Sequence, residues 1–201
     1  MITLCMDTSS AFLVLAVVKD HTMLAKLQKI CWKRQSEEIF PALEMLFNKA
    51  GLKPAAIDQI VVTKGPGSYT GVRIAMTIAK VFCAMADKPL ATLSTLQLYA
   101  GNLAHARVVL DARSQRAYTA VYDQGICVEK ETVCSIATII KKMDEKVTVV
   151  GDGHLVNRAD YIPDLAENFL LLEKQWQFSH QVHMVNPTYL KDSESYITGV
   201  R

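Results

Sequence analysis

The sequence predicts a two-lobed α/β fold with mixed sheets, and three observations lead to this prediction. The chain opens with three apolar segments joined by short polar turns, a pattern typical of antiparallel strands. Segments with helical periodicity then alternate with short apolar strands, as in β-α-β units. A second series of strands begins near Arg107. Half of the 201 residues are apolar and 21% are charged, which is the composition of a globular protein rather than a disordered one.

The first half contains eight predicted elements. We expect strands over residues 2–6, 12–18, 23–33, 57–63 and 89–93, and helices over residues 36–50, 69–86 and 95–104. Ser36 is the expected N-cap of the first helix, and Gly51 is expected to end it in the left-handed conformation. Three antiparallel strands followed by β-α-β units give the order of the ribonuclease-H-like core, which actin-like proteins also use.

The second half is expected to form a smaller lobe. We expect strands over residues 107–110, 117–122, 126–133 and 147–150, and a helix over residues 135–145. The polar segment 101–105 separates the two series of elements. The predicted division is therefore an N-terminal lobe of residues 1–103 and a C-terminal lobe and tail of residues 104–201.

Charge, cysteine content and the N-terminus predict a cytoplasmic protein without membrane segments. The net charge of +2 does not by itself predict nucleic-acid binding. Five cysteines without a C-x-x-C pair, three of them in apolar runs, are typical of small buried side chains in a reducing compartment. Met1 leads directly into a strand without a basic segment, so no signal peptide is predicted. The apolar stretch 74–86 is interrupted by Lys80 and is too short to span a bilayer.

Two helices carry wider apolar arcs than packing on a sheet requires. In the helix over residues 69–86, Arg73, Thr77 and Lys80 form one narrow polar stripe. The first helix repeats the pattern. We therefore expect both helices to dock on another protein, with an interface made of Phe40, Met45, Phe47, Ile74, Met76 and Phe82. The alternative is that the C-terminal segment of the same chain covers them.

Two short segments are candidates for anion or nucleotide binding. Asp7, Thr8 and Ser9 follow the first strand, where proteins of this fold often hold a metal or a phosphate. Gly65, Gly67 and Ser68 lie between a strand and a helix N-terminus, whose N–H groups bind anions. The second segment lacks the Gly-Lys-Ser/Thr ending of a Walker loop. The alternative for both segments is a purely structural role in shaping turns.

The sequence offers no catalytic set. The strand over residues 57–63 ends on Thr63 and Lys64, and the lysine would repel the metal that a ribonuclease-H nuclease needs. Asp111 and Arg113 are expected to form an internal ion pair. Surface roles are expected for the histidines, and the alternative of a metal site concerns only the pair His180 and His183. No catalytic residue, metal ligand or resident cofactor is therefore assigned.

Several motifs resemble those of the TsaB (YeaZ) family. They are DTS at residues 7–9, KGPGSYTGVRI at 64–74, LDAR at 110–113, VGDG at 150–153 and PTYLK at 187–191. The resemblance covers nearly the whole chain. The sequence departs from the family at Gln35, where a histidine is usual, and at Arg116, near a place where an acidic residue is common.

The resemblance implies an actin-like (ASKHA) fold and a role in tRNA processing. TsaB proteins form dimers with themselves or with the catalytic TsaD, pairing through the two helices. With TsaD and the ATPase TsaE they place a threonylcarbamoyl group on the adenine next to the anticodon of tRNAs that read codons beginning with A. TsaD carries the active site and a metal-binding histidine pair, whereas residues 94–102 of this chain contain no histidine. The resemblance thus implies a non-catalytic subunit, with ATP or ADP and a metal present only through TsaD and TsaE.

The alternative functions are a stand-alone ATP-dependent kinase or ATPase of the actin-like type, and a peptidase or nuclease. The kinase would need a glycine-rich turn after the first strand, and Asp7-Thr8-Ser9-Ser10 has no glycine. The peptidase or nuclease would need a base or metal ligands that the sequence does not offer.

Overall fold

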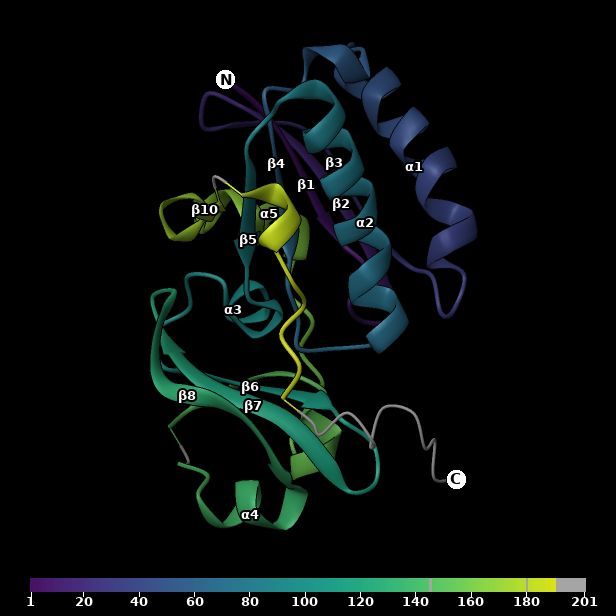
Figure 1. Cartoon of the computed structure of the whole chain (residues 1–201). Helices are drawn as coiled ribbons and strands as arrows, with labels where there is room; N and C mark the ends of the chain where they lie inside the picture. The colour runs from purple at the N-terminus through teal and green to yellow at the C-terminus, as the bar shows by residue number, and fades with distance from the viewer. Residues whose placement is uncertain (145, 180, 191–201) are drawn as a thin grey trace.

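The computed structural model describes residues 1–144, 146–179 and 181–190, which form two mixed sheets with helices on their faces. The first sheet has six strands in the order β10-β5-β4-β1-β2-β3, and the second has four in the order β8-β7-β6-β9. Figure 1 shows the first sheet with α1 and α2 in the upper part, the second sheet with α4 in the lower part, and α3 between them. The predicted two-lobed α/β class is confirmed.

The strands and helices have the following bounds. The first sheet contains β1 (Ile2–Asp7), β2 (Phe12–Lys19), β3 (Thr22–Ile30), β4 (Gln59–Thr63), β5 (Leu90–Leu93) and β10 (Gln177–Ser179). The second contains β6 (Ala106–Asp111), β7 (Arg116–Asp123), β8 (Ile126–Ser135) and β9 (Thr148–Gly151). The α-helices are α1 (Gln35–Ala50), α2 (Tyr69–Ala86), α3 (Thr95–Ala100), α4 (Ile136–Lys141) and α5 (Leu165–Leu171).

The strand pairing follows the predicted order. β1, β2 and β3 form an antiparallel meander, and β4 and β5 add parallel to β1. The parallel pairs require crossover helices, which α1 and α2 supply on the same face. A core of Leu, Val, Ile and Met side chains separates these helices from the sheet. The opposite face of the first sheet packs through α3 and α5 toward the second sheet.

Helix α1 starts differently from a simple capped helix but ends as predicted. It begins at Gln35, and Arg34 rather than the expected Ser36 is its N-cap residue, without a side-chain cap bond. The buried Gln35 side chain instead donates to the Ser10 carbonyl at 2.8 Å, which ties the helix start to the turn after β1. Gly51 ends the helix at φ +66°, as predicted, because a left-handed C′ position favours glycine.

Helix α2 is long and apolar enough to cross a membrane by length and composition alone. The expectation of a segment too short to span a bilayer considered only the apolar stretch 74–86. The whole helix runs for 18 residues from Tyr69, so that expectation was wrong on length. One face is buried against the first sheet through Val72, Ala75, Met76, Ala79 and Cys83. These contacts make α2 a core helix of the fold.

The C-terminal segment returns to the first sheet. Helix α5 packs against β2 and β3, and β10 pairs antiparallel with β5 at the edge of the sheet. Lys26 on β3 contacts Asp164 at 2.6 Å and Glu167 at 2.8 Å. Residues after 163 therefore contribute to the first sheet, and the predicted division between residues 103 and 104 remains a prediction.

The packing of α5 generates a stability prediction. Phe169 on α5 is fully buried between the two sheets, and the Trp176 indole donates to its carbonyl at 3.1 Å. We expect Phe169→Ala to lower the free energy of unfolding by about 3–5 kcal/mol, because it leaves a cavity in the core. Phe178→Ala on β10, where the ring is 49% exposed, should cost about 0.5 kcal/mol or less. Urea denaturation measures both, and equal losses would contradict the interior position of α5.

Candidate functional site

The end of β1 is in direct contact with the first turns of α2. The fully buried Thr8 hydroxyl donates to the Gly71 carbonyl at 2.6 Å and accepts from the Ala75 N–H at 3.1 Å. A Cβ on Gly71 would overlap the Thr8 carbonyl oxygen. The two segments can therefore approach this closely only because residue 71 is glycine.

The glycine-rich turn before α2 is held in the same way. The Ser68 N–H donates to the Ser9 carbonyl at 2.8 Å, and the Ser68 hydroxyl caps the helix by accepting from Gly71 N at 3.2 Å. A Cβ on Gly67 would overlap the Ser9 carbonyl. Gly65, at φ +96°, accepts from Thr95 N at 2.9 Å and leaves room for the Thr188 carbonyl.

The structure thus brings together all six residues expected to contact an anion or nucleotide. Their hydrogen bonds and close contacts are with one another and with neighbouring protein segments. These contacts tie the turn to the end of β1, and Ser68, Tyr69 and Thr70 at the start of α2 are exposed. The anion contact therefore remains a prediction, and the observed contacts have a structural role.

Asp7 is the buried carboxyl at the centre of this junction. Its Oδ1 accepts from Ser9 N at 3.0 Å and from the Thr63 hydroxyl, whereas its Oδ2 has no partner among the described residues. Burial raises the pKa of Asp7 above its usual range, and the hydrogen bonds from Ser9 and Thr63 oppose that rise.

The described part of the chain offers no metal site. No group of three or more His, Cys, Asp or Glu side chains within residues 1–144, 146–179 and 181–190 is placed to hold a metal ion. His183 is exposed, and His180 lies outside the described residues, so the alternative of a paired site there also lies outside them.

The expected ion pair between Asp111 and Arg113 is wrong. The Asp111 carboxylate accepts the backbone N–H of Arg113 at 2.7 Å, and the exposed Arg113 guanidinium has no salt bridge within the described residues. Asp111 and Arg113 are two residues apart in a tight hairpin, where the backbone N–H of Arg113 is the donor nearest to the Asp111 carboxylate.

Helix α2 exposes one continuous apolar stripe, which we call the α2 stripe: Ile74, Ile78, Val81 and Met85. The spacing i, i+4, i+7 and i+11 places these side chains on one side of the helix. Val81 is 53% and Met85 is 84% exposed, while the other two are partly buried. Phe82 lies beside the stripe and is also partly buried.

Two of the expected interface residues are in the core instead. Met76 is 3% and Phe47 is 8% exposed, and both pack under the helices. Met76 shares the spacing of Val72, Ala79 and Cys83, which is the buried face of α2. Helical spacing alone could have identified this second stripe. We correct the interface accordingly and remove both residues from it.

Helix α1 has exposed apolar residues but no continuous apolar face. Phe40 is 62% and Met45 is 65% exposed. Five residues of α-helix separate them by about 140° around the axis. The exposed polar residues Glu44 and Asn48 lie between them. The apolar arc expected on α1 is therefore two separate positions.

The C-terminal segment covers the polar stripe of α2. The Lys80 ammonium donates to the carbonyls of His183 at 2.9 Å and Val185 at 3.0 Å. At the other end, the Tyr189 ring stacks on Tyr69 with centroids 5.4 Å apart. We call residues 182–189 the strap. The strap covers the side of α2 that carries Lys80 and leaves Val81 and Met85 exposed. The alternative that the C-terminal segment covers the helices therefore holds for the polar stripe of α2 and not for its exposed apolar side.

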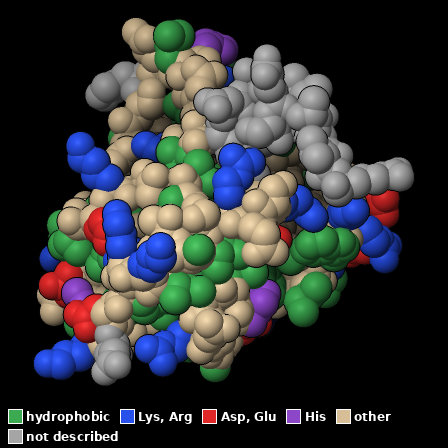
Figure 2. Space-filling view, turned by 90° about the horizontal axis from the view of Figure 1, so that it is seen from below, with side chains coloured by type: hydrophobic (Ala, Val, Ile, Leu, Met, Phe, Trp, Pro, Cys, Tyr) green, Lys and Arg blue, Asp and Glu red, His purple; other side chains and the backbone are tan. Residues whose placement is uncertain are grey.

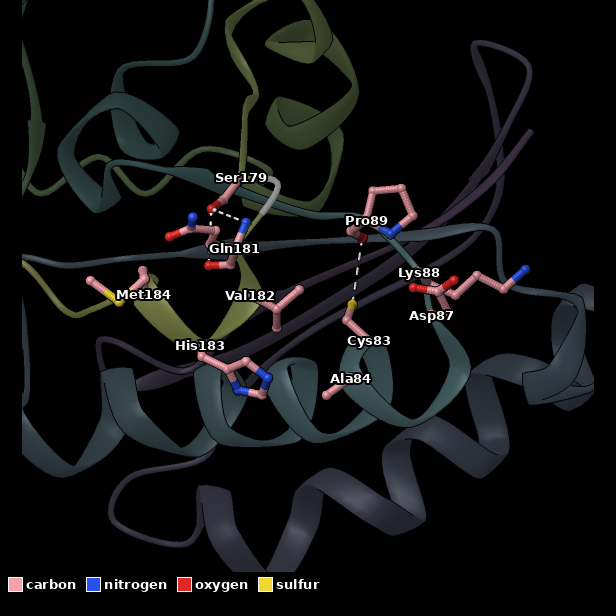
Figure 3. A pocket seen from close by; sticks show the side chains of 10 residues that line it. All are labelled: Cys83, Ala84, Asp87, Lys88, Pro89, Ser179, Gln181, Val182, His183 and Met184. Carbon is pink, nitrogen blue, oxygen red and sulfur yellow. Dashed lines mark hydrogen bonds between the residues drawn. The ribbon is translucent and has the colours of Figure 1, made fainter.

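A shallow groove lies between the C-terminal end of α2 and the start of the strap (Figure 3). Its volume is about 570 Å³, and its lining includes Ala84, Lys88 and Met184. Figure 3 shows the Cys83 side chain directed at the Pro89 carbonyl, to which its thiol donates at 3.4 Å. Burial raises the pKa of this thiol to about 11, so it is neutral at pH 7 and unsuited to nucleophilic attack.

The fold and this junction define a class of protein. Two lobes built on mixed sheets, with a strand end packed against the N-terminus of a crossover helix, are the framework of actin-like proteins. In this chain, protein contacts hold the turn before α2, and the crossover helix α2 carries the exposed apolar α2 stripe.

The family model described as TsaD, tRNA N6-adenosine threonylcarbamoyltransferase, matches residues 29–169. A TsaB protein of Bacillus subtilis, named as a tRNA threonylcarbamoyladenosine biosynthesis protein, is 29% identical over 97% of this chain and 96% of its own. A tRNA N6-adenosine threonylcarbamoyltransferase of Phytoplasma australiense is 34% identical over 46% of this chain and 29% of its own. The solved structure of YeaZ from Pseudomonas aeruginosa superposes with a TM-score of 0.78 and 21% identity, covering 94% of this chain and 99% of that chain.

The chain therefore belongs to the TsaD-related family and, within it, to the TsaB (YeaZ) proteins. The resemblance inferred from the motifs is confirmed, and so is the actin-like fold.

The buried Asp7 generates a pH prediction. Because its pKa is raised in the folded state, that state binds more protons than the unfolded chain, and stability falls as pH rises above the ordinary value of 3.8. Asp7→Asn keeps the Oδ1 acceptor and removes the titration. We expect the variant to lose less stability than the natural chain between about pH 4 and pH 8 in urea denaturation.

Asp160 supplies a control of opposite sign. Hydrogen bonds from the His154 N–H and imidazole lower its pKa, so its contribution to stability is lost as pH falls. Asp160→Asn should lower the free energy of unfolding near neutral pH and change it little at acid pH, where the natural carboxyl has already lost its contribution. Identical pH profiles for Asp7→Asn and the natural chain would contradict the buried, proton-holding carboxyl.

Proposed function

We propose that this chain is the non-catalytic partner subunit of a complex that makes N6-threonylcarbamoyladenosine in tRNA, and that it binds and supports a TsaD-type transferase through the α2 stripe. The observation that carries the proposal is the exposed stripe itself. Its four apolar side chains lie in line on a rigid helix whose opposite face is buried in the core. The names of the relatives supply the pathway, which is biosynthesis of threonylcarbamoyladenosine in tRNA.

The physical case for docking is the cost of leaving the stripe in water. Val81 and Met85 are more than half exposed on consecutive turns of the helix, and removing apolar surface from water contributes roughly 25 cal/mol per Å². The spacing of the stripe is the one that lets a second helix pack alongside. Lys80 and Arg73, which would disrupt such packing, are held on the strap side.

The case against independent catalysis rests on chemistry in the described residues. The thiols of Cys5 and Cys83 have raised pKa values because they are buried. Thr8, Ser9 and Ser68 form hydrogen bonds within the junction at the start of α2. These features favour an accessory role for this chain. We propose that the metal, the nucleotide and the transfer chemistry belong to TsaD and TsaE.

The remaining composition of the complex follows from the family resemblance. We propose a heterodimer with TsaD, association with TsaE, a homodimer when the chain is alone, and contact with tRNA through the complex in the cytoplasm. The stand-alone kinase has less support, because protein contacts occupy the turn that would hold its nucleotide phosphates.

The α2 stripe generates a binding prediction. Val81→Glu places a charge at the centre of the stripe, and burying it against a partner should weaken the complex with TsaD at least about tenfold, since an unpaired buried charge costs well over 1.4 kcal/mol. Size exclusion with light scattering and a titration by fluorescence anisotropy measure the loss. TsaD from the same organism should be used.

Val128 on β8 offers a matched control. It is 60% exposed, close to the value for Val81, and lies in the second sheet away from α2. Val128→Glu should leave TsaD binding unchanged, and both variants should unfold at the urea concentration of the natural chain. Normal binding by Val81→Glu, with TsaD folded and nucleotide supplied, would contradict the proposal.

A further inference from the structure

The turn between β6 and β7 is a tight hairpin carrying two arginines. Ala112 N donates to Arg116 O at 3.0 Å, and Arg116 N donates to Arg113 O at 3.1 Å. Ser114 and Gln115 are the two central residues of this turn, and their φ values of +54° and +55° are the positive values of a type I′ turn. We call residues 113–116 the arginine hairpin.

The arginine hairpin keeps a conformation that its residues disfavour. Arg113 is also left-handed, at φ +61°, so three consecutive non-glycine residues have positive φ. Asn and Gly are the usual residues of such a turn, and each L-residue with a larger side chain costs about 1 kcal/mol there. Such strain persists where the surrounding structure holds it and is concentrated at functional positions. Here the Ile136 N–H holds the tip by donating to Gln115 O at 3.0 Å.

The charges of the arginine hairpin are free to bind an anion. Arg113 is exposed and Arg116 partly exposed, and neither has a salt bridge within the described residues. The nearby carboxylates are engaged with backbone, because Asp111 accepts from Arg113 N at 2.7 Å and Asp152 accepts from Asp111 N at 2.7 Å. The backbone N–H groups of Ser114 and Gln115 have no acceptor in the same described part of the chain.

The turn brings the backbone positions of the two arginines close together, so that both long side chains can extend toward one ligand. The first and fourth residues of a β-turn have Cα atoms less than about 7 Å apart, so the two long side chains start from neighbouring points. A guanidinium presents paired N–H donors that match phosphate oxygens, and exposed backbone N–H groups add to the same anion.

We infer that the arginine hairpin binds a phosphate group of the RNA backbone, which rests on the proposed function in that the RNA is the tRNA of the complex. The hairpin residues line neither of the two grooves that lie along α2. Contact with a backbone phosphate needs no enclosing groove. Figure 2, which looks onto the second-sheet side, shows more Lys and Arg than Asp and Glu side chains on that face.

The arginine hairpin and the α2 stripe are positioned to act together. Figure 1 places the hairpin between β6 and β7 in the lower lobe, whereas the stripe is on α2 in the upper lobe. The hairpin is therefore separate from the surface that we propose for the protein partner. Phosphate contacts of this kind would orient the tRNA on the complex without reading its sequence.

The test is tRNA binding by the complex of this chain with TsaD. A fluorescein-labelled, unmodified tRNA transcript is titrated by anisotropy at several salt concentrations. We expect Arg113→Gln/Arg116→Gln to bind about tenfold more weakly and to lower the salt slope by about 1–2, the loss of one or two phosphate contacts. The control is Lys19→Gln/Lys53→Gln, which removes the same charge from two exposed positions in the first lobe and should change neither value.

The outcomes separate this inference from the proposed function. Affinity for TsaD is measured independently and should be unchanged in both variants. Failure of the natural chain to bind TsaD would count against the proposed function, whereas weaker TsaD binding in the arginine variant alone would place the hairpin in the protein interface and overturn its assignment to RNA. Unchanged tRNA affinity and salt slope in the arginine variant would overturn the inference. ATP is titrated as a second phosphate source, and a loss confined to ATP binding would overturn the assignment to RNA.

Discussion

The hydroxyl of Thr8 joins the end of β1 to the first turns of α2 by accepting from Ala75 and donating to the Gly71 carbonyl. This contact requires glycine at position 71, since any side chain there would overlap the Thr8 backbone. It fixes where α2 starts and how the helix lies on the sheet. The buried face of α2, the strap contact and the exposed stripe all follow from that placement.

Helix α2 is therefore divided into three sides with different roles. One side, with Met76 and Ala79, completes the core of the first sheet. The second, with Lys80, is covered by the strap through bonds to two strap carbonyls. The third is the α2 stripe, which the described residues leave in water. A helix divided in this way can meet a partner from one direction only, which suits a subunit that supports another protein.

Most of the first lobe follows from sequence patterns, because its strands are long, continuous and separated by clear turns. The sequence identified Thr8 and Gly67 as candidates for anion contact and Gly71 as part of a family motif, but it did not predict that these residues meet. What they do there required coordinates, because the same glycines that cradle a phosphate also permit close backbone packing. The structure places protein atoms in those contacts.

The features that sequence reasoning missed have definite physical causes. Strand β10 has three residues, which is too short to show a period of two, and the strap has no regular structure at all over most of its length. Met76 was misplaced because the wide apolar arc of α2 was treated as one face, although the shared spacing of Val72, Met76, Ala79 and Cys83 marks the buried side. The start of α1 was misjudged because Gln35 ties the helix to the Ser10 carbonyl, a tertiary contact that no capping pattern predicts.

The central claim is that the α2 stripe meets the partner, and methionine oxidation tests it most directly. Met85 on the stripe is 84% exposed, while Met1 and Met184 outside it are 63% and 67% exposed, so all three should oxidise readily in the chain alone. After TsaD is added, mass spectrometry should find Met85 protected and Met1 still reactive. Continued oxidation of Met85 in a complex of proven stoichiometry would contradict the account.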